Sequence, residues 1–95
     1  MASTYILYSI SKDSFYIGFT TENVELRIIR HNTDYYNDKY TALGKPWELF
    51  LEIPCDSEKQ ARNIEAHIKA MKSKKYIENL KKYPDIIRKL IIKYS

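Results

Sequence analysis

Residues 4–20, which read TYILYSISKDSFYIGFT, decide the fold. The two halves of this stretch, 4–10 and 15–20, are rich in β-branched and aromatic side chains, which favour strands. Between them stand residues 11–14, all of which favour turns. The pattern therefore predicts a β-hairpin.

The length of the hairpin loop determines which side chains share a face. If Ile10 faces Ser14 across a three-residue loop, antiparallel pairing places Tyr8 opposite Tyr16, and both phenols lie on one face. A four-residue loop would send the two tyrosines to opposite faces, because a one-residue slip inverts the side-chain pattern. We expect the three-residue loop and a facing pair of tyrosines.

A short helix is predicted next, from about Glu22 to His31, with Thr21 as its N-cap. One stripe of this helix, at i, i+3, i+4 and i+7, consists of Val24, Arg27, Ile28 and His31. The arginine and the histidine are therefore neighbours. Leu26 and Ile29 occupy another side, so we expect the helix to be partly enclosed.

The second half of the chain begins with residues 47–53, whose alternating pattern, closed by Pro54, predicts a third strand with one buried face. Ser57 and Gln60 form a capping-box pattern that opens a long helix. The apolar stripe of that helix, which should pack on the sheet, consists of Ala61, Ile64, Ile68 and Met71. Glu65 lies roughly 40° from Ala61 on the helical wheel, at the rim of this stripe.

Two shorter helices are expected after the long one. Ser73 can cap a helix over residues 74–80, and Pro84 suits the first turn of a last helix. The predicted order is β-β-α-β-α-α-α, an α+β fold in which helices flank a small three-stranded antiparallel sheet. A chain of 95 residues has about the length of one domain, so we expect residues 1–95 to form a single domain.

Composition narrows the partners and the compartment. Sixteen lysines and arginines against twelve acidic residues give a formal charge of +4 and a pI near 9.1, which favours an anionic partner. Cys55 is the only cysteine, which excludes an internal disulfide and a cysteine-rich zinc site. Neither an export signal nor a membrane span is visible, so we expect a reducing, cytoplasmic location and no membrane association.

Several short motifs follow one another along the chain: Tyr5-Ile6-Leu7-Tyr8, Phe15-Tyr16-Ile17-Gly18, Leu26-Arg27, His31-Asn32 and Glu65. In this order they resemble the GIY-YIG nuclease family, especially its small stand-alone, single-domain members. The resemblance covers most of the chain. Two departures stand out: Ile6 takes the place of the motif's glycine, and the asparagine often found beyond the glutamate has only Asn79 as a candidate.

The resemblance implies a metal-dependent endonuclease that hydrolyses phosphodiester bonds in nucleic acid, with DNA favoured over RNA. The catalytic residues that it implies are Tyr8, Tyr16, Arg27, His31 and Glu65, with the two tyrosines near the attacking water. Glu65 would also be the ligand of a divalent metal ion, Mg²⁺ or Mn²⁺. Gly18 would leave the backbone open beside the scissile phosphate.

The chemistry of these residue types agrees with this activity. A phenol has an unperturbed pKa of about 10, so it acts as a base near neutrality only where positive charge, here from Arg27 and a metal, favours phenolate. Mg²⁺ often accepts only one or two protein carboxylates, so Glu65 is sufficient. Lys72, Lys74 and Lys75 lie beyond Glu65 at a helix junction and are candidates for binding substrate phosphates.

The polar stretch 32–46 lacks clear periodicity and is predicted to be one long loop. It contains three tyrosines that are candidates for contact with nucleic acid, Tyr35, Tyr36 and Tyr40. Loops are also polar for simpler reasons.

Each candidate residue also has a structural interpretation. Strand tyrosines usually pack, cations at a helix end are commonly solvated, and Glu65 can form an ordinary i,i+4 salt bridge with Lys69. Two other functions therefore stay open. One is a catalytically silent nucleic-acid-binding module with the same fold, and the other is a structural interaction domain with no affinity for nucleic acid.

Overall fold

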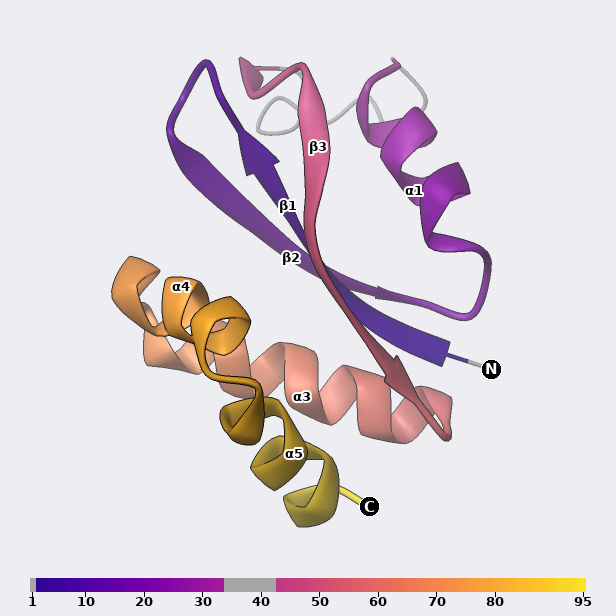
Figure 1. The fold of residues 1–95 in the computed structure, drawn as a ribbon. Coiled ribbons are helices and arrows are strands. Elements are labelled where there is room, and N and C mark those ends of the chain that lie inside the picture. The colour runs from indigo at the N-terminus through magenta and orange to yellow at the C-terminus, as the bar shows by residue number, and fades with distance from the viewer. Residues whose placement is uncertain (1, 34–42) are drawn as a thin grey trace.

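The computed structural model describes residues 2–33 and 43–95 (Figure 1). Its elements are β1 (Ala2–Ser9), β2 (Ser14–Thr20), α1 (Val24–His31), β3 (Trp47–Cys55), α3 (Glu58–Met71), α4 (Lys74–Lys82) and α5 (Pro84–Lys93). The predicted α+β fold and its order of elements are confirmed. Most of the predicted loop 32–46, including its three tyrosines, lies outside the described residues.

The sheet has the strand order β2-β1-β3, and β1 pairs antiparallel with both neighbours. β1 is therefore the central strand, and β2 and β3 are the edge strands. In Figure 1, α1 lies on one side of this twisted sheet, whereas α3, α4 and α5 lie on the other. The sheet thus separates two packing layers.

The pairing register of the hairpin differs from the predicted one. Leu7 lies opposite Tyr16, and Tyr8 lies opposite Phe15. Because successive side chains of a strand point to opposite faces, Tyr8 and Tyr16 lie on different faces of the sheet. The expectation of a facing pair of tyrosines is therefore wrong.

The physical reason lies in the turn. Ser9 pairs with Ser14, which leaves a four-residue loop, and the Ser9 hydroxyl accepts a hydrogen bond from the Lys12 amide at 3.1 Å. Asp13 then adopts a left-handed conformation with φ of 47°, which returns the chain into β2. Ile10 stays outside the pairing and is 61% exposed.

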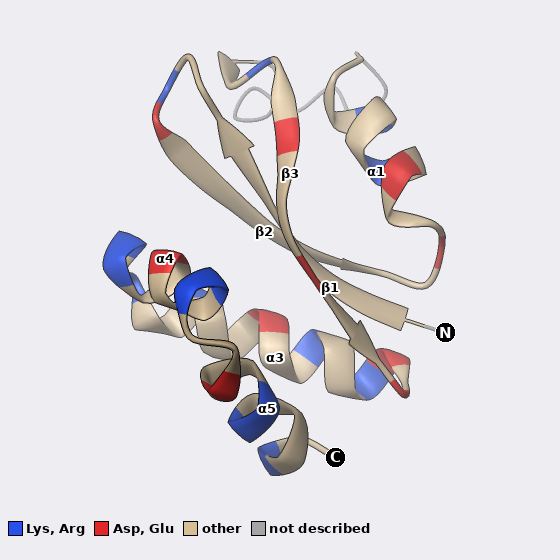
Figure 2. Cartoon of the chain, viewed as in Figure 1, with Lys and Arg blue, Asp and Glu red and all other residues tan. Residues whose placement is uncertain are grey.

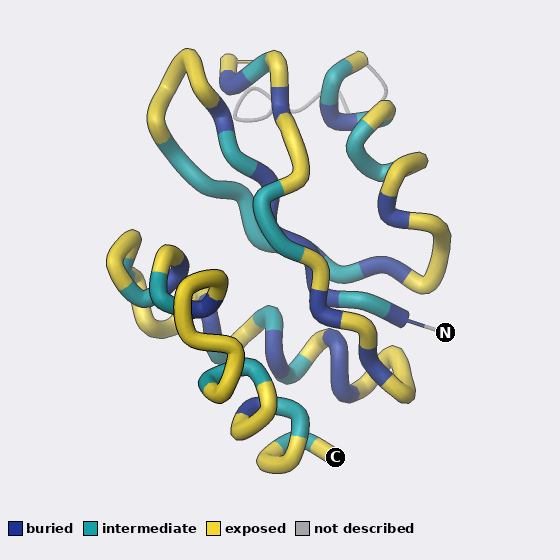
Figure 3. The backbone as a smooth tube through the Cα atoms, viewed as in Figure 1, coloured by how far each residue is buried: buried dark blue, intermediate teal, exposed yellow. Residues whose placement is uncertain are grey.

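The two faces of the sheet bury different sets of residues. Against α1 the buried residues are Tyr5, Leu7, Val24 and Trp47, with Tyr16 and Ile28 packed beside them. Against α3, α4 and α5 a larger cluster includes Ile6, Ile53, Ala61, Ile64, Ile68, Ile77, Leu80 and Leu90. Figure 3 shows the buried segments along the sheet and on the inner sides of the helices. Alternation along β1 explains why both layers use this strand.

α1 begins later than predicted, because Asn23 and not Thr21 is its N-cap. The Asn23 side chain accepts a hydrogen bond from the Glu25 amide at 2.7 Å. The Thr20 hydroxyl accepts one from the Glu22 amide at 2.9 Å, so the residues before Asn23 form a turn instead of a first helical turn.

The predicted stripe of α1 does face the sheet, and its first and last residues, Val24 and His31, are buried. The helix is enclosed on this side alone, because Leu26 is 46% and Ile29 59% exposed, so the second side that we expected to be covered faces solvent. α1 therefore packs through one stripe only, and the cations of that stripe border the sheet.

β3 and α3 follow the predicted patterns with two differences. β3 continues to Cys55 with Pro54 inside it, which an edge strand tolerates because its outer N–H groups need no strand partner. The Ser57 side chain caps α3, as predicted, by accepting from the Gln60 amide at 3.1 Å. Met71 is 45% exposed, so it does not continue the buried stripe, because α3 ends at this residue.

The last two helices begin as predicted. The Ser73 side chain accepts a hydrogen bond from the Tyr76 amide at 3.0 Å and caps α4, and Pro84 is the first residue of α5. Within the part of the chain that the structure describes, no helix combines the length and the apolar character needed to cross a bilayer.

α5 covers one flank of α3. The Gln60 side-chain amide donates to the Ile91 carbonyl at 3.1 Å, and His67 Nδ1 lies 2.9 Å from the Tyr94 hydroxyl. His67 is therefore half-buried beneath α5. The other flank of α3 faces towards the edge strand β2.

Candidate active site

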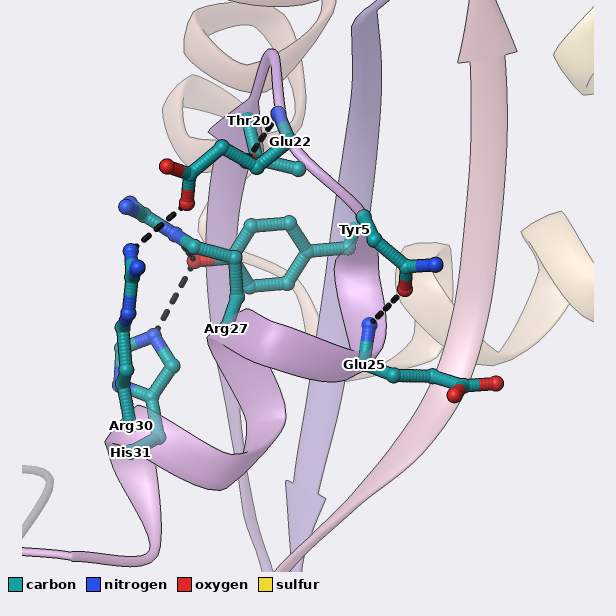
Figure 4. A network of polar contacts seen from close by, with 8 residues as sticks. Tyr5, Thr20, Glu22, Glu25, Arg27, Arg30 and His31 are labelled. Carbon is teal, nitrogen blue, oxygen red and sulfur yellow. Dashed lines mark hydrogen bonds and ion pairs between the residues drawn. The ribbon is translucent and has the colours of Figure 1, made fainter.

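A cluster of polar side chains lies between α1 and the sheet. The Tyr5 hydroxyl oxygen lies 3.1 Å from His31 Nε2 and accepts a longer hydrogen bond, 3.4 Å, from Arg27 Nε. Figure 4 shows the Tyr5 ring reaching from β1 towards these two side chains of α1. Tyr5 is fully buried and His31 is 3% exposed, whereas Arg27 is half-buried. One phenol oxygen thus holds the arginine and the histidine together.

Tyr16 joins this cluster from β2. Its ring centroid lies 4.6 Å from that of His31, with the two rings tilted by 56°. Tyr16 is half-buried, so unlike Tyr5 it has access to solvent. Of the predicted catalytic residues, Arg27 and His31 meet at the Tyr5 oxygen, and Tyr16 packs on His31.

Gly18 is the reason that the Tyr5 ring fits against β2. The two residues are strand partners, and a Cβ atom added at Gly18 would lie 2.6 Å from the Tyr5 hydroxyl oxygen and 2.7 Å from Cζ. Such distances are clashes with a buried ring that has no room to move. The ring of Tyr5, and not open backbone, therefore occupies the space above Gly18.

Two anchors hold α1 in place behind the cluster. Arg30 forms an ion pair with Glu22 at 2.7 Å (Figure 4). The Asn32 side chain donates to the Trp47 carbonyl at 2.9 Å and accepts from the Trp47 amide at 2.5 Å. Asn32 directly follows the helix, so this pair of bonds fixes the end of α1, and with it His31, against the start of β3.

Tyr8 lies elsewhere. It is on the opposite face of the sheet, where its hydroxyl donates to the Asp13 carboxylate at 2.6 Å. This hydrogen bond raises the pKa of Tyr8, because the carboxylate stabilises the protonated phenol. A phenol held in this way is poorly suited to act as a base.

Sequence reasoning missed Tyr5, because the signal for it depends on the hairpin register. Strand pairing through a four-residue loop places Tyr5 opposite Gly18 and Leu7 opposite Tyr16. A large ring that lies over the neighbouring strand requires a glycine there. This requirement distinguishes Tyr5 from Tyr8 only once the register is known.

Glu65 lies on α3, on the opposite side of the sheet from the Tyr5 cluster. Its carboxylate is 3.4 Å from Lys69 Nζ, and its side chain is 18% exposed. On the same flank of α3, the Arg62 guanidinium lies 5.8 Å from the Phe19 ring centroid, and Lys69 borders a hollow together with Ile17. Phe19 and Ile17 belong to β2, so Glu65 stands along this edge strand, at the rim of the packing face as predicted.

β2 therefore separates two groups of candidate residues. Tyr16 lies on its α1 side, and Glu65 lies beside its α3 side. A substrate that contacts both groups would have to pass around the free edge of this strand.

The donor set at Glu65 suits one kind of metal ion. Among the described residues, no group of three or more His, Cys, Asp or Glu side chains is arranged to hold a metal. Zn²⁺ typically takes three or four protein ligands, so these residues do not fit it. Mg²⁺ and Mn²⁺ keep most of their waters and accept a single carboxylate, so a partly exposed Glu65 fits them.

The three candidate phosphate-binding lysines differ in their surroundings. Lys74 forms an ion pair with the Asp13 carboxylate at 2.7 Å and donates to the Asp13 carbonyl at 2.9 Å. This contact lowers the pKa of Asp13, and it ties the hairpin turn to α4. Lys72 ends α3 in a left-handed conformation, and both Lys72 and Lys75 are exposed. Lys74 is therefore engaged in holding the turn.

The fold is a three-stranded antiparallel sheet flanked by helices. The site beside its edge strand is a cluster of tyrosine, arginine and histidine side chains. Residues 1–80 match the protein-family model described as the GIY-YIG catalytic domain. This chain belongs to the GIY-YIG family, a family of nucleases, as the sequence motifs indicated. No curated protein and no solved structure gives a significant match.

Proposed function

We propose that this protein is an endonuclease that uses a divalent metal ion to hydrolyse phosphodiester bonds in DNA. The observation that carries the proposal is the contact of the Tyr5 hydroxyl with both Arg27 and His31, beside the half-exposed Tyr16. Membership of a nuclease family supports the reaction class. Packing alone does not require an arginine and a histidine to share one buried phenol oxygen.

Tyr16 directs the attacking water in this proposal. It is the tyrosine of the cluster that reaches solvent, and its ring rests against His31. Arg27 bonds the same Tyr5 oxygen that lies next to His31. Its planar guanidinium group can bind a non-bridging phosphate oxygen. Positive charge there also favours the phenolate form of a nearby tyrosine.

Tyr5 is a positioning residue. It is fully buried, so it does not reach the substrate, but it fixes the side chains of Arg27 and His31 through one oxygen atom. The first motif of the family would then end at Tyr5 and read Ser3-Thr4-Tyr5. Tyr8, which the sequence favoured, would have no direct part in the reaction.

Glu65 would hold the metal ion, and it would have to release Lys69 to do so. A divalent ion supplies charge that stabilises the phosphate and the leaving oxygen in the transition state. The same ion pair between Glu65 and Lys69 is the observation that favours the alternative function, a nucleic-acid-binding module without catalysis. Lys69 is 54% exposed and can move into solvent, so the pair is a weak obstacle to a metal ion.

The test is cleavage of duplex, single-stranded and branched DNA with Mg²⁺ or Mn²⁺. We expect cleavage by the natural protein, reduced about 10²- to 10⁴-fold in Tyr16→Phe and similarly in Arg27→Ala and Glu65→Gln. Tyr83→Phe, which removes an exposed phenol between α4 and α5, is the matched control and should keep full activity. Binding without cleavage of any substrate in either metal would establish the silent module instead.

A further inference from the structure

We propose that one flank of α3 is a cationic track that binds the phosphates of a nucleic-acid strand on both sides of Glu65. The cations of this track are Lys59, Arg62, Lys69 and Lys72. The inference rests on the proposed function, because it takes Glu65 as the point beside which the scissile phosphate lies. The inference adds that the nucleic-acid strand runs along α3, and it names the side chains that hold the strand there.

Three of these cations lie together on one flank of α3. At about 100° per residue, Arg62 and Lys69 fall about 20° apart on the helical wheel, and Glu65 lies about 40° from Lys69. The opposite flank of α3 is covered by α5, through Gln60 and His67. The track therefore occupies the flank that faces the edge strand β2, and Lys59, about 60° beyond Arg62, extends it onto the outer side of the helix.

Two surface hollows lie on either side of the Glu65–Lys69 ion pair. The first is lined by Lys59 and Arg62 together with Glu65 itself, and by Glu58, Asn63 and Ala66. Lys69, which forms the ion pair with Glu65, borders the second hollow. A strand that follows the two hollows thus passes directly beside the Glu65 carboxylate.

The second hollow lies between β2 and the junction of α3 with α4. Its rim carries Lys69, Lys72 and Lys74, and its floor is apolar, with Ile17 and Ile68 among the lining residues. Lys74 is engaged by Asp13 and Lys69 by Glu65, so Lys72 is the principal cation of this end, and Lys69 would join it when a metal ion takes Glu65. The apolar floor can accommodate a sugar and a base of the nucleic acid. The lysine ammonium groups at the rim can then bind the neighbouring phosphates.

The acidic residues of the flank do not cancel this charge. Glu58 is 3.9 Å from Arg62, but both side chains are more than half exposed, and such surface pairs contribute little. Glu65 is the other acid, and a metal ion would neutralise it. Figure 2 shows the basic and acidic segments along α3 and the basic segments at both ends of α4.

The length of the track also suits a nucleic-acid strand. At 1.5 Å per residue, α3 rises about 15 Å between Lys59 and Lys69. One strand of duplex DNA advances 3.4 Å per nucleotide along its axis, so this distance corresponds to about four nucleotides. Phosphates on both sides of the scissile bond therefore fall within reach of the track.

The experiment measures how salt weakens binding of a fluorescein-labelled DNA, as a single strand and as a duplex, in EDTA to prevent hydrolysis. The variants are Arg62→Gln and Lys72→Gln, one from each side of Glu65, and their double variant. The matched control is Lys89→Gln, which removes an exposed lysine of α5 outside the track. Circular dichroism checks that every variant is folded.

Each phosphate contact contributes about 0.7 to the slope of log K against log salt for a single strand and about 0.9 for a duplex. We expect each single variant to lose about this amount and the double variant about twice as much, with no change in Lys89→Gln. Slopes in Arg62→Gln and Lys72→Gln equal to that of Lys89→Gln would overturn the track.

Cleavage by the same proteins separates this proposal from the proposed function. If the slopes of the variants are reduced and the natural protein cleaves no substrate in any metal, the track is supported and the proposed hydrolysis is contradicted. If the slopes are unchanged and the natural protein shows metal-dependent cleavage, the track is contradicted and the proposed hydrolysis is supported.

Discussion

The two faces of the sheet differ in the kinds of side chain that they bury. The face under α3, α4 and α5 buries a mainly aliphatic cluster. The polar side chains buried beside this cluster bond to backbone carbonyls: the Thr4 hydroxyl donates to Ala61 at 2.7 Å, and the Gln60 amide donates to Ile91 at 3.1 Å. The face under α1 is smaller and buries a phenol and an imidazole that bond to each other. Polar groups are costly to bury, so their presence on the less extensively packed face points to chemistry and not to stability.

The face under α3, α4 and α5 therefore contributes most of the stability, and the face under α1 fixes the geometry of the candidate site. The large cluster keeps the sheet and α3 together, which places Glu65 along β2. The smaller cluster positions the side chains of α1 against Tyr16. Mutations on the two faces should therefore differ in what they change.

The largest expected effect is on the α3 face. Ile64 is completely buried there, so Ile64→Ala should lower the free energy of unfolding by about 2–5 kcal/mol through lost burial and the cavity left behind. Urea denaturation measures this loss. Ile29→Ala, an identical change at a site that is 59% exposed on α1, is the control and should cost less than about 1 kcal/mol. Equal losses in the two variants would contradict the division between the faces.

A smaller effect on stability, with a direct effect on the site, is expected from Gly18→Ala. The added methyl group would overlap the Tyr5 ring, so we expect a loss of about 1–3 kcal/mol and displacement of the hydroxyl from Arg27 and His31. Urea denaturation and the cleavage rate together measure both consequences.

Ile6→Val is the control for Gly18→Ala, because it alters the neighbouring strand on the opposite face of the sheet, where Ile6 is fully buried. It should cost about 0.5–1.5 kcal/mol and leave cleavage unchanged. If Gly18→Ala were as active as Ile6→Val, the packing of Tyr5 on Gly18 would have no importance for the site.

The sequence predicts the element order and most helix starts, because these depend on local patterns. Ser57, Ser73 and Pro84 begin their helices as side-chain chemistry predicts. The position of Glu65 at the rim of α3 also follows from helical periodicity alone. The pair Arg27 and His31 was predictable for the same reason.

The hairpin register was not predictable from the same kind of pattern. Both loop lengths leave alternating strands, and the choice between them depends on the Ser9 hydroxyl that bonds the Lys12 amide and on the left-handed Asp13. Neither residue is a glycine that would signal the turn. The predicted loop is one residue shorter than the observed one. The predicted partner of Tyr16 is therefore Tyr8, whereas in the structure Tyr16 shares a face with Tyr5.

The central claim is that Tyr5, and not Tyr8, belongs with Tyr16, Arg27 and His31. The most direct test is the ¹⁵N NMR chemical shift of His31 Nε2 in the natural protein and in the variants Tyr5→Phe and Tyr8→Phe. Tyr5→Phe removes the oxygen 3.1 Å from this nitrogen, so we expect the Nε2 resonance to move, whereas Tyr8→Phe should leave it in place. A resonance that moves in Tyr8→Phe and stays unchanged in Tyr5→Phe would contradict the account.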